Sequence, residues 1–172
     1  MNRTGAIPMS VVMCVLVLVT LPMPALSQTS AAVGYQALHL PENWVPVGVN
    51  FDVAREVSGN WSIVGEFGVA NEGGDSELDF DGYNIFNIGG GVRWSLEREG
   101  PVPFAQLLAG VQLSRAETDR DTAFMLQPGA GVHLPLNDRW GLSAQFDYRP
   151  VFYREETTQE VRFVIGARWT RP

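Results

Sequence analysis

Two histidines, His39 and His133, and a single cysteine, Cys14, are the residues of this chain best suited to catalysis. A histidine acts as general base for a serine or thiolate nucleophile only when the two side chains can reach hydrogen-bonding distance. His133 lies in the segment GVHL, and His39 is followed by Leu40 and Pro41, so neither has a nucleophile in its local motif. We therefore predict no catalytic residues and no cofactor.

The acidic segment Asp75–Asp81 (DSELDFD) is a second candidate, because its alternating carboxylates could supply oxygen ligands to Ca²⁺. It lacks the glycine and the terminal glutamate at the spacing of an EF-hand loop. Runs of charge are usually solvated. We interpret the segment as a solvated loop and predict no metal site.

Charged side chains also recur at alternate positions of otherwise apolar segments. The chain has twelve basic residues, all of them arginine, and the planar arginine fork pairs well with carboxylates. A GC-rich genome would give the same preference for arginine. We predict an ion network on one face of a sheet. Its members are Asp52, Glu66, Arg93, Asp147, Arg149, Arg162 and Arg168.

The segment FNIGGGVRWSLE, residues 86–97, shows the pattern that would position these charges. Phe86, Val92 and Trp94 fall on one face, and Asn87 and Arg93 fall on the other. This period of two predicts a strand with one apolar and one polar side. The same alternation predicts eight strands in all. They are Ala31–Leu40, Val45–Val57, Trp61–Asn71, Tyr83–Glu97, Pro103–Ala116, Thr122–Leu136, Trp140–Tyr153 and Gln159–Thr170.

The connections between these strands alternate between short turns and longer, more acidic loops, as in transmembrane barrels. Four tryptophans lie at strand ends beside the short turns: Trp61, Trp94, Trp140 and Trp169. Indole side chains favour the membrane interface, so we predict that these four form an interfacial girdle. The predicted fold is an all-β, eight-stranded antiparallel up-and-down transmembrane β-barrel with a polar interior and a lipid-facing apolar exterior. Because Pro128 lies within the sixth strand, we also predict a bulge at Pro128-Gly129.

The first 27 residues have the features of a secretory signal peptide. Arg3 precedes the apolar segment Val11–Leu21, and Ala25-Leu26-Ser27 provides small residues before a cleavage site. We therefore predict a signal peptide at 1–27 and a barrel domain at 28–172. Cys14 lies in the removed segment, which leaves the mature chain without a disulfide. The net charge of −7 becomes more negative when Arg3 is lost, which argues against nucleic acid as a partner.

The segments GGGVRWSL, PFAQLLAGVQ and VRFVIGARW resemble those of the eight-stranded outer-membrane β-barrel family that includes the OmpA transmembrane domain and OmpX-like proteins. This resemblance implies an outer-membrane location and insertion by the outer-membrane assembly machinery, which reads the last strand. Gly166 and Trp169 match the glycine and one aromatic of that assembly signal. Arg171 replaces the second aromatic, and Pro172 follows it.

We therefore expect a non-catalytic integral outer-membrane protein in contact with outer-membrane lipid, with a structural or surface-interaction role and at most a narrow pore. We expect a monomer whose loop Asn71–Gly82 is available to a surface partner. One alternative is a secreted soluble lipocalin-like barrel whose apolar face lines a ligand cavity. Another, less favoured, is an outer-membrane enzyme that modifies lipid and uses His133.

Overall fold

The computed structural model describes residues 28–41, 44–45, 47–72, 83–96, 98–115, 120–154 and 156–171. The predicted signal peptide and the candidate calcium loop lie outside these residues. Within the described ranges, no helix is long and apolar enough to cross a bilayer.

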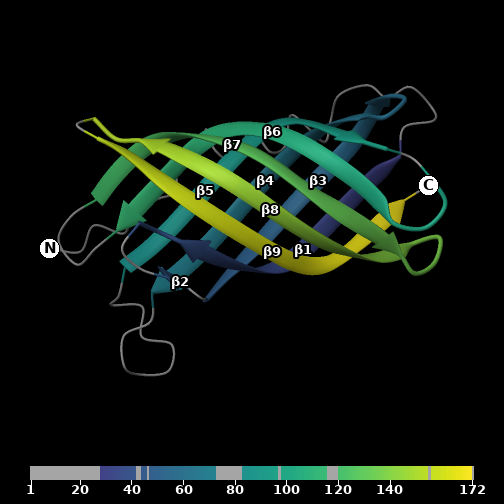
Figure 1. The fold of residues 1–172 in the computed structure, drawn as a ribbon, viewed down its shortest axis with the longest axis horizontal. Helices are drawn as coiled ribbons and strands as arrows, with labels where there is room; N and C mark the ends of the chain where they lie inside the picture. Colours follow the sequence, from purple (N-terminus) through teal and green to yellow (C-terminus); the bar gives the residue numbers. More distant parts are fainter. Residues whose placement is uncertain are drawn as a thin grey trace, which may run out of the picture.

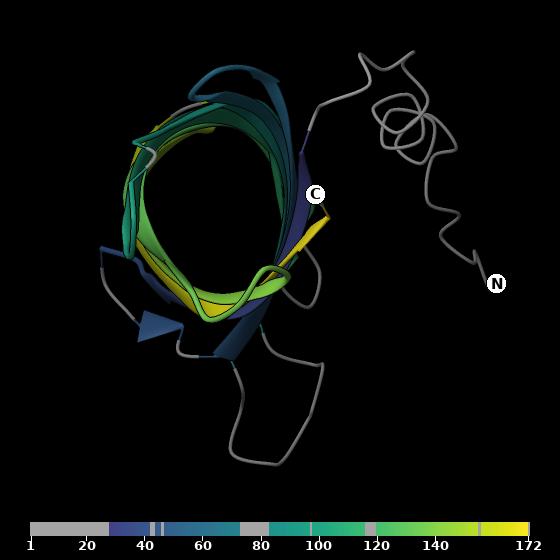
Figure 2. The same ribbon diagram turned by 90° about the vertical axis from the view of Figure 1, so that its right-hand side faces the viewer.

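Nine labelled strands form one antiparallel sheet that closes on itself (Figures 1 and 2). They are β1 (Thr29–His39), β2 (Trp44–Val45), β3 (Val47–Ser58), β4 (Trp61–Glu72), β5 (Tyr83–Ser95), β6 (Val102–Arg115), β7 (Arg120–Pro135), β8 (Trp140–Phe152) and β9 (Thr157–Arg171). Each of β3 to β9 pairs with its neighbour in sequence, and β9 pairs with the whole length of β1 through its residues Val161–Arg171. Closure leaves no unpaired sheet edge, which is what a strand structure in lipid requires.

Strands β2 and β3 occupy a single position in the barrel, beside β1. Tyr35 of β1 pairs with Val49 of β3, whereas Leu38 pairs with Val45 of β2, so the register shifts by one residue between them. Pro46, which has no N–H to donate, separates the two strands in the sequence. The eight-stranded up-and-down barrel is thus confirmed, but the predicted single strand from Val45 to Val57 is wrong at its start.

The predicted bulge at Pro128-Gly129 is also wrong. Leu107 pairs with Pro128 in an unbroken ladder between β6 and β7. Between β7 and β8 the register is the same on both sides of a gap, with Met125 opposite Val151 and Gly129 opposite Asp147. The ladder is therefore interrupted at the proline, where a donor is missing, without insertion of an extra residue.

The three short connections, residues 59–60, 96–101 and 136–139, lie at one end of the barrel, here called the turn end. Thr29 at the start of β1 pairs with Arg171 at the end of β9, so both described ends of the chain also lie there. The opposite end, where β1, β4, β6 and β8 end, is here called the loop end. Gly59 has a φ of 49°, a left-handed conformation that suits glycine in the two-residue turn between β3 and β4.

The two faces of the wall are distributed as the alternation predicted. On β5, Val92 is 45% exposed on the outside, while its neighbour Arg93 is 1% exposed on the inside. Large apolar side chains are exposed outward on every strand from β1 to β9. The apolar face therefore does not line a cavity, which contradicts the lipocalin-like alternative.

Apolar side chains also fill part of the interior at the loop end. One buried cluster consists of Leu38, Val45, Ala70 and Ile85. A second consists of Ala123, Met125 and Val151, with Tyr153 packed against it. These clusters face inward and fill part of the interior near the loop end.

Candidate functional site: the barrel interior

Arg162 on β9 is the centre of the interior ion network. Its Nη2 lies 2.7 Å from Glu66 Oε2 on β4 and 2.7 Å from Asp147 Oδ2 on β8, and all three side chains are fully buried. Its Nε donates to Asp147 Oδ2 at 2.9 Å, and its Nη1 donates to Gln36 Oε1 at 3.3 Å. One guanidinium therefore joins strands from around the barrel through charge-assisted hydrogen bonds.

Glutamines complete the coordination of the two carboxylates. Gln127 donates to Glu66 Oε1 at 3.0 Å. Gln106 and Gln145 donate to the two oxygens of Asp147 at 3.1 and 2.8 Å. Buried charges are tolerated when they are both paired and hydrogen-bonded, and this cluster meets both conditions.

Arg93 on β5 forms a separate group nearer the turn end. Its Nη2 lies 3.1 Å from Asp52 Oδ1, and its Nε donates to Gln106 Oε1 at 3.0 Å. Its guanidinium carbon lies 4.7 Å from the centre of the Phe104 ring, a cation–π contact. Phe104 in turn stacks on His133, with ring centres 4.3 Å apart.

Arg149 on β8 pairs with Glu160 on β9, a residue that the sequence analysis did not name. The two lie 3.8 Å apart, and Gln112 connects them. Gln112 accepts from Arg149 Nη2 at 2.6 Å and donates to Glu160 Oε1 at 2.7 Å. Glu160 occupies the same inward parity as Arg162, so continuing the alternation to the start of β9 would have identified it.

Arg168 on β9 differs from the other three inward arginines. In the described part of the chain it forms no ion pair with a carboxylate; its Nη2 donates instead to Ser30 Oγ at 2.7 Å. Its Nη1 is buried and has no hydrogen-bond partner among the described residues. The structure therefore brings six of the seven predicted network residues into ion pairs and leaves Arg168 outside them.

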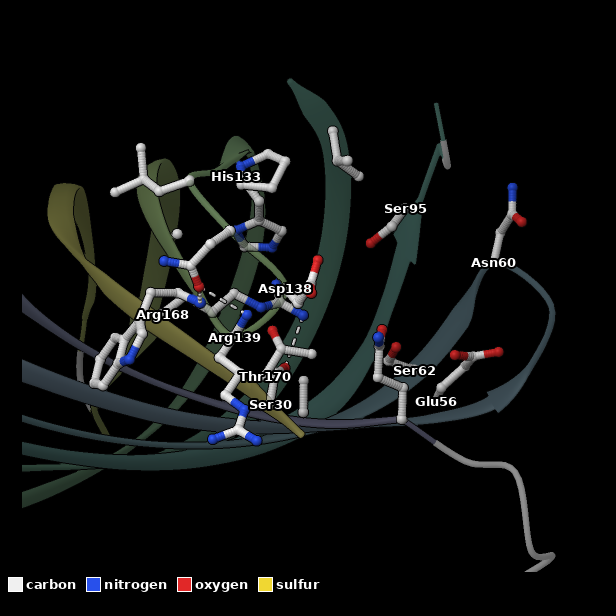
Figure 3. A pocket seen from close by; sticks show the side chains of 18 of the residues that line it. Ser30, Glu56, Asn60, Ser62, Ser95, His133, Asp138, Arg139, Arg168 and Thr170 are labelled. Carbon is white, nitrogen blue, oxygen red and sulfur yellow. Dashed lines mark hydrogen bonds between the residues drawn. The ribbon is translucent and has the colours of Figure 1, made fainter. Parts of the chain in front are cut away.

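A cavity of about 520 Å³ opens at the turn end of the barrel (Figure 3). It is here called the vestibule. Ser30, Ser62, Ser95 and Thr170 contribute hydroxyl groups to its lining, and Arg168 and His133 also line it. Farther in, Arg93, Arg149 and Arg162 are at most 1% exposed. The vestibule is thus a recess in the turn end, backed by tightly packed polar side chains.

His133 lines the vestibule without a hydrogen bond to a nucleophile among the described residues. Both ring nitrogens are buried, and neither has a hydrogen-bond partner in the described ranges. Ser143 is its neighbour in register on β8, yet no hydrogen bond joins them. His39, near the loop end, packs edge-on against Trp44 with ring centres 4.6 Å apart.

The four tryptophans of the predicted girdle all lie at the turn end, on the outside of the wall. Trp61 pairs in register with Trp94, and Trp140 pairs with Trp169. Each is at least 36% exposed. They are here called the turn-end tryptophans. Gly166 of the predicted assembly signal pairs with Gly34 on β1, where an added Cβ would collide with the β1 backbone.

A closed antiparallel barrel with apolar side chains outside and paired charges inside defines the class of transmembrane β-barrels. Comparison with solved structures places the chain among the small eight-stranded examples. Neisserial surface protein A matches with a TM-score of 0.63 at 8% identity, over 83% of this chain and 96% of that one. Ail, the attachment invasion locus protein of Yersinia pestis, matches with a TM-score of 0.59 at 14% identity, over 84% of this chain and 99% of that one.

The N-terminal β-barrel domain of Pseudomonas aeruginosa OprF matches with a TM-score of 0.52 at 12% identity, over 85% of this chain and 100% of that domain. No family model and no curated protein matches the sequence. At these identities the likeness is one of fold. The chain therefore has the eight-stranded outer-membrane barrel fold that its resemblance to the OmpA and OmpX-like family implied.

Proposed function

We propose that this chain is an integral outer-membrane protein that is neither an enzyme nor an open pore and that presents its loops at the cell surface. The main observation behind this proposal is that the outside of the barrel wall is apolar and exposed, whereas the interior contains charged side chains in ion pairs. In water, an apolar wall of this extent would promote association. In lipid it is the favoured surface, and the closed ladder satisfies the backbone.

The membrane proposal is tested first by gel mobility of the mature chain refolded in detergent, with and without boiling. A folded barrel resists the gel detergent, so the unheated sample should run at a different position from the boiled one. Fractionated cells should carry the protein with the outer membrane. Folding in buffer without detergent, with no mobility shift, would contradict the proposal.

The interior supports the absence of an open pore. Arg162, Gln112 and Gln127 are fully buried in the middle of the barrel, and the apolar clusters fill part of the interior near the loop end. We expect no stepwise current from the purified protein in a planar bilayer at neutral pH. Stepwise currents that scale with protein concentration would show that the packed interior opens.

Among the described residues, no nucleophile is hydrogen-bonded to His133, which supports a non-catalytic role because geometry between base and nucleophile is the first requirement. We expect His133→Ala to leave the lipid A composition of producing cells unchanged. The matched comparison is cells that lack the protein altogether. A change in lipid A that depends on His133 would establish the enzyme alternative.

The loop Asn71–Gly82 supports the surface role through its charge. The loop contains five acidic residues and no basic residue. Of its twelve residues, the structure describes Asn71 and Glu72. A partner at this loop would therefore carry basic groups. Replacing residues 73–82 with a neutral segment of equal length should abolish binding of a polyarginine probe while the heat-dependent mobility shift remains. Unchanged binding would refute this role for the loop.

We propose that the barrel acts as a monomer. Light scattering of the protein in detergent tests this proposal, and a mass of two or more chains would contradict it.

The last strand supports insertion by the outer-membrane assembly machinery. Trp169→Ala should slow appearance of the heat-shifted form in cells, because Trp169 belongs to the proposed signal. Trp140→Ala is the matched control, since Trp140 is the cross-strand partner of Trp169 and is also exposed. Equal slowing by both variants would indicate a general effect of the girdle rather than an assembly signal.

A further inference from the structure

The inward arginines of the described residues are not all paired with carboxylates. Arg93, Arg149 and Arg162 are buried, Arg168 lines the vestibule, and four carboxylates are buried among them: Asp52, Glu66, Asp147 and Glu160. Arg162 takes two of these carboxylates, Arg93 takes one and Arg149 takes one. Asp52 also attracts Arg168 electrostatically but forms its ion pair with Arg93, and no described carboxylate forms an ion pair with Arg168.

Arg168 is held in place by a neutral group alone. Ser30 Oγ accepts from its Nη2, but a hydroxyl carries no charge, and Nη1 is buried without a partner. Arg168 is partly buried, and a guanidinium in such a place is stabilised by an opposite charge beside it. A counter-charge from solution would supply this stabilisation.

A counter-charge from solution can reach Arg168 through the vestibule. Arg168 lines it, and Gly141, its register neighbour on β8, has no side chain to obstruct the space between β7 and β9. His133, on the β7 side, provides two buried nitrogens without partners. Figure 3 shows these side chains with the hydroxyls of Ser30, Ser62 and Thr170 around the same recess.

The carboxylates at the mouth do not serve this purpose. Glu56 and Asp138 line the vestibule, but neither forms an ion pair with Arg168. Asp138 is exposed and lies in the turn between β7 and β8, where Arg139 balances its charge. The mouth thus keeps the one negative charge of Glu56, and the guanidinium of Arg168 lies deeper without an ion pair among the described residues.

We propose that the vestibule is a binding site for a small solute with an anionic oxygen group, a carboxylate or a phosphate, which Arg168 pairs with and His133 hydrogen-bonds. A volume of about 520 Å³ admits a small organic anion, and falls within the range typical of small-molecule sites. The recess opens at the aqueous end of the barrel and not through its lipid-facing wall. Its ligand is therefore a dissolved anion of the compartment on the turn side.

The two histidines make the test specific. The mature chain, folded in zwitterionic nanodiscs, is labelled at histidine and titrated with inorganic phosphate and with acetate at constant pH and ionic strength. The ring signals of His133 should shift and saturate, while those of His39, near the opposite end, should not move. Shifts of both histidines, or of neither, would overturn the proposal; in the second case water alone fills the recess.

A substitution then assigns the site to Arg168. Arg168→Gln should weaken the binding of phosphate about tenfold or more, since it removes the charged donor. Arg154→Gln is the matched control, because Arg154 is exposed at the loop end. If Arg168→Gln loses the heat-dependent mobility shift and so fails to fold, Arg168→Lys replaces it and should bind phosphate more weakly than the unaltered chain. Unchanged affinity in the folded variant would overturn the proposal.

A third experiment distinguishes a dissolved anion from the phosphate of a lipid headgroup. Without added phosphate or acetate, the nanodiscs are prepared with increasing anionic phospholipid. His133 signals should remain in place. Saturable shifts with anionic lipid alone would show that a headgroup occupies the site and would overturn the assignment to a dissolved anion.

Discussion

Replacing Arg162 with methionine removes the shared partner of two buried carboxylates. Met keeps an unbranched side chain in the space but provides no donor. Glu66 loses a 2.7 Å contact, and Asp147 loses contacts at 2.7 and 2.9 Å. Both side chains are fully buried, so water cannot replace the lost donors. Removing one partner of a buried pair costs about 3–5 kcal/mol. With two carboxylates affected, we expect the upper part of that range.

The free energy of unfolding is measured by urea titration of the barrel in phospholipid vesicles at neutral pH, followed by tryptophan fluorescence and extrapolated linearly. Arg154→Met is the matched control, because the same chemical change at an exposed loop-end position should cost at most about 0.5 kcal/mol.

A triple variant separates the loss of pairing from the loss of packing. Glu66→Gln, Asp147→Asn and Arg162→Met together remove all three charges with little change in volume. Neutral replacement of a whole buried ion group is often close to neutral in stability. We expect the triple variant to lie within about 1 kcal/mol of the unaltered chain. A cost below about 1 kcal/mol for Arg162→Met alone, or a triple variant as unstable as the single one, would refute the electrostatic explanation.

Three further predictions concern the wall and its ends. Ile165→Arg lies at a mid-strand outward position that is 68% exposed and should lower the free energy of unfolding by about 2–4 kcal/mol in the same assay. Leu134→Arg, near the turn end, should lower it by about 0–1 kcal/mol. Equal losses would contradict the assigned depths of these two positions in the bilayer. Gly59→Ala should cost about 1–2 kcal/mol from its positive φ alone, because an added Cβ meets nothing within 4 Å. Gly59→Asn should cost less, since asparagine tolerates this conformation, and the opposite order would argue against backbone strain. Lipids brominated near the headgroup should quench the turn-end tryptophans more strongly than lipids brominated near the chain ends, and the reverse would place these indoles at the bilayer centre.

The alternation of side chains predicted the fold and the inward position of each network residue. Asn87 and Arg93 could be assigned to the interior because a period of two leaves only two faces to choose between. Pro128 misled the prediction, since a missing donor can be accommodated by a gap in the ladder as well as by a bulge. The break between β2 and β3 was missed because both halves continue the same apolar pattern.

The pairing within the network could not be predicted in the same way. The contact of Arg162 with both Glu66 and Asp147 depends on the register between strands and on the curvature of the closed barrel. The unpaired state of Arg168 follows only after every other partner has been placed. Sequence parity therefore identifies the inward residues, but three-dimensional register decides which of them meet.

The position of Arg162 in the last strand has a consequence for the order in which the barrel can form. Glu66 lies 96 residues earlier in the chain, and Gln36 lies 126 residues earlier. Until β9 arrives, Glu66 and Asp147 lack the guanidinium that pairs with both of them, and long-range pairings of this kind are slow to establish. The Arg162 cluster thus stabilises only the completed ring, so a chain truncated before β9 would lack this contribution.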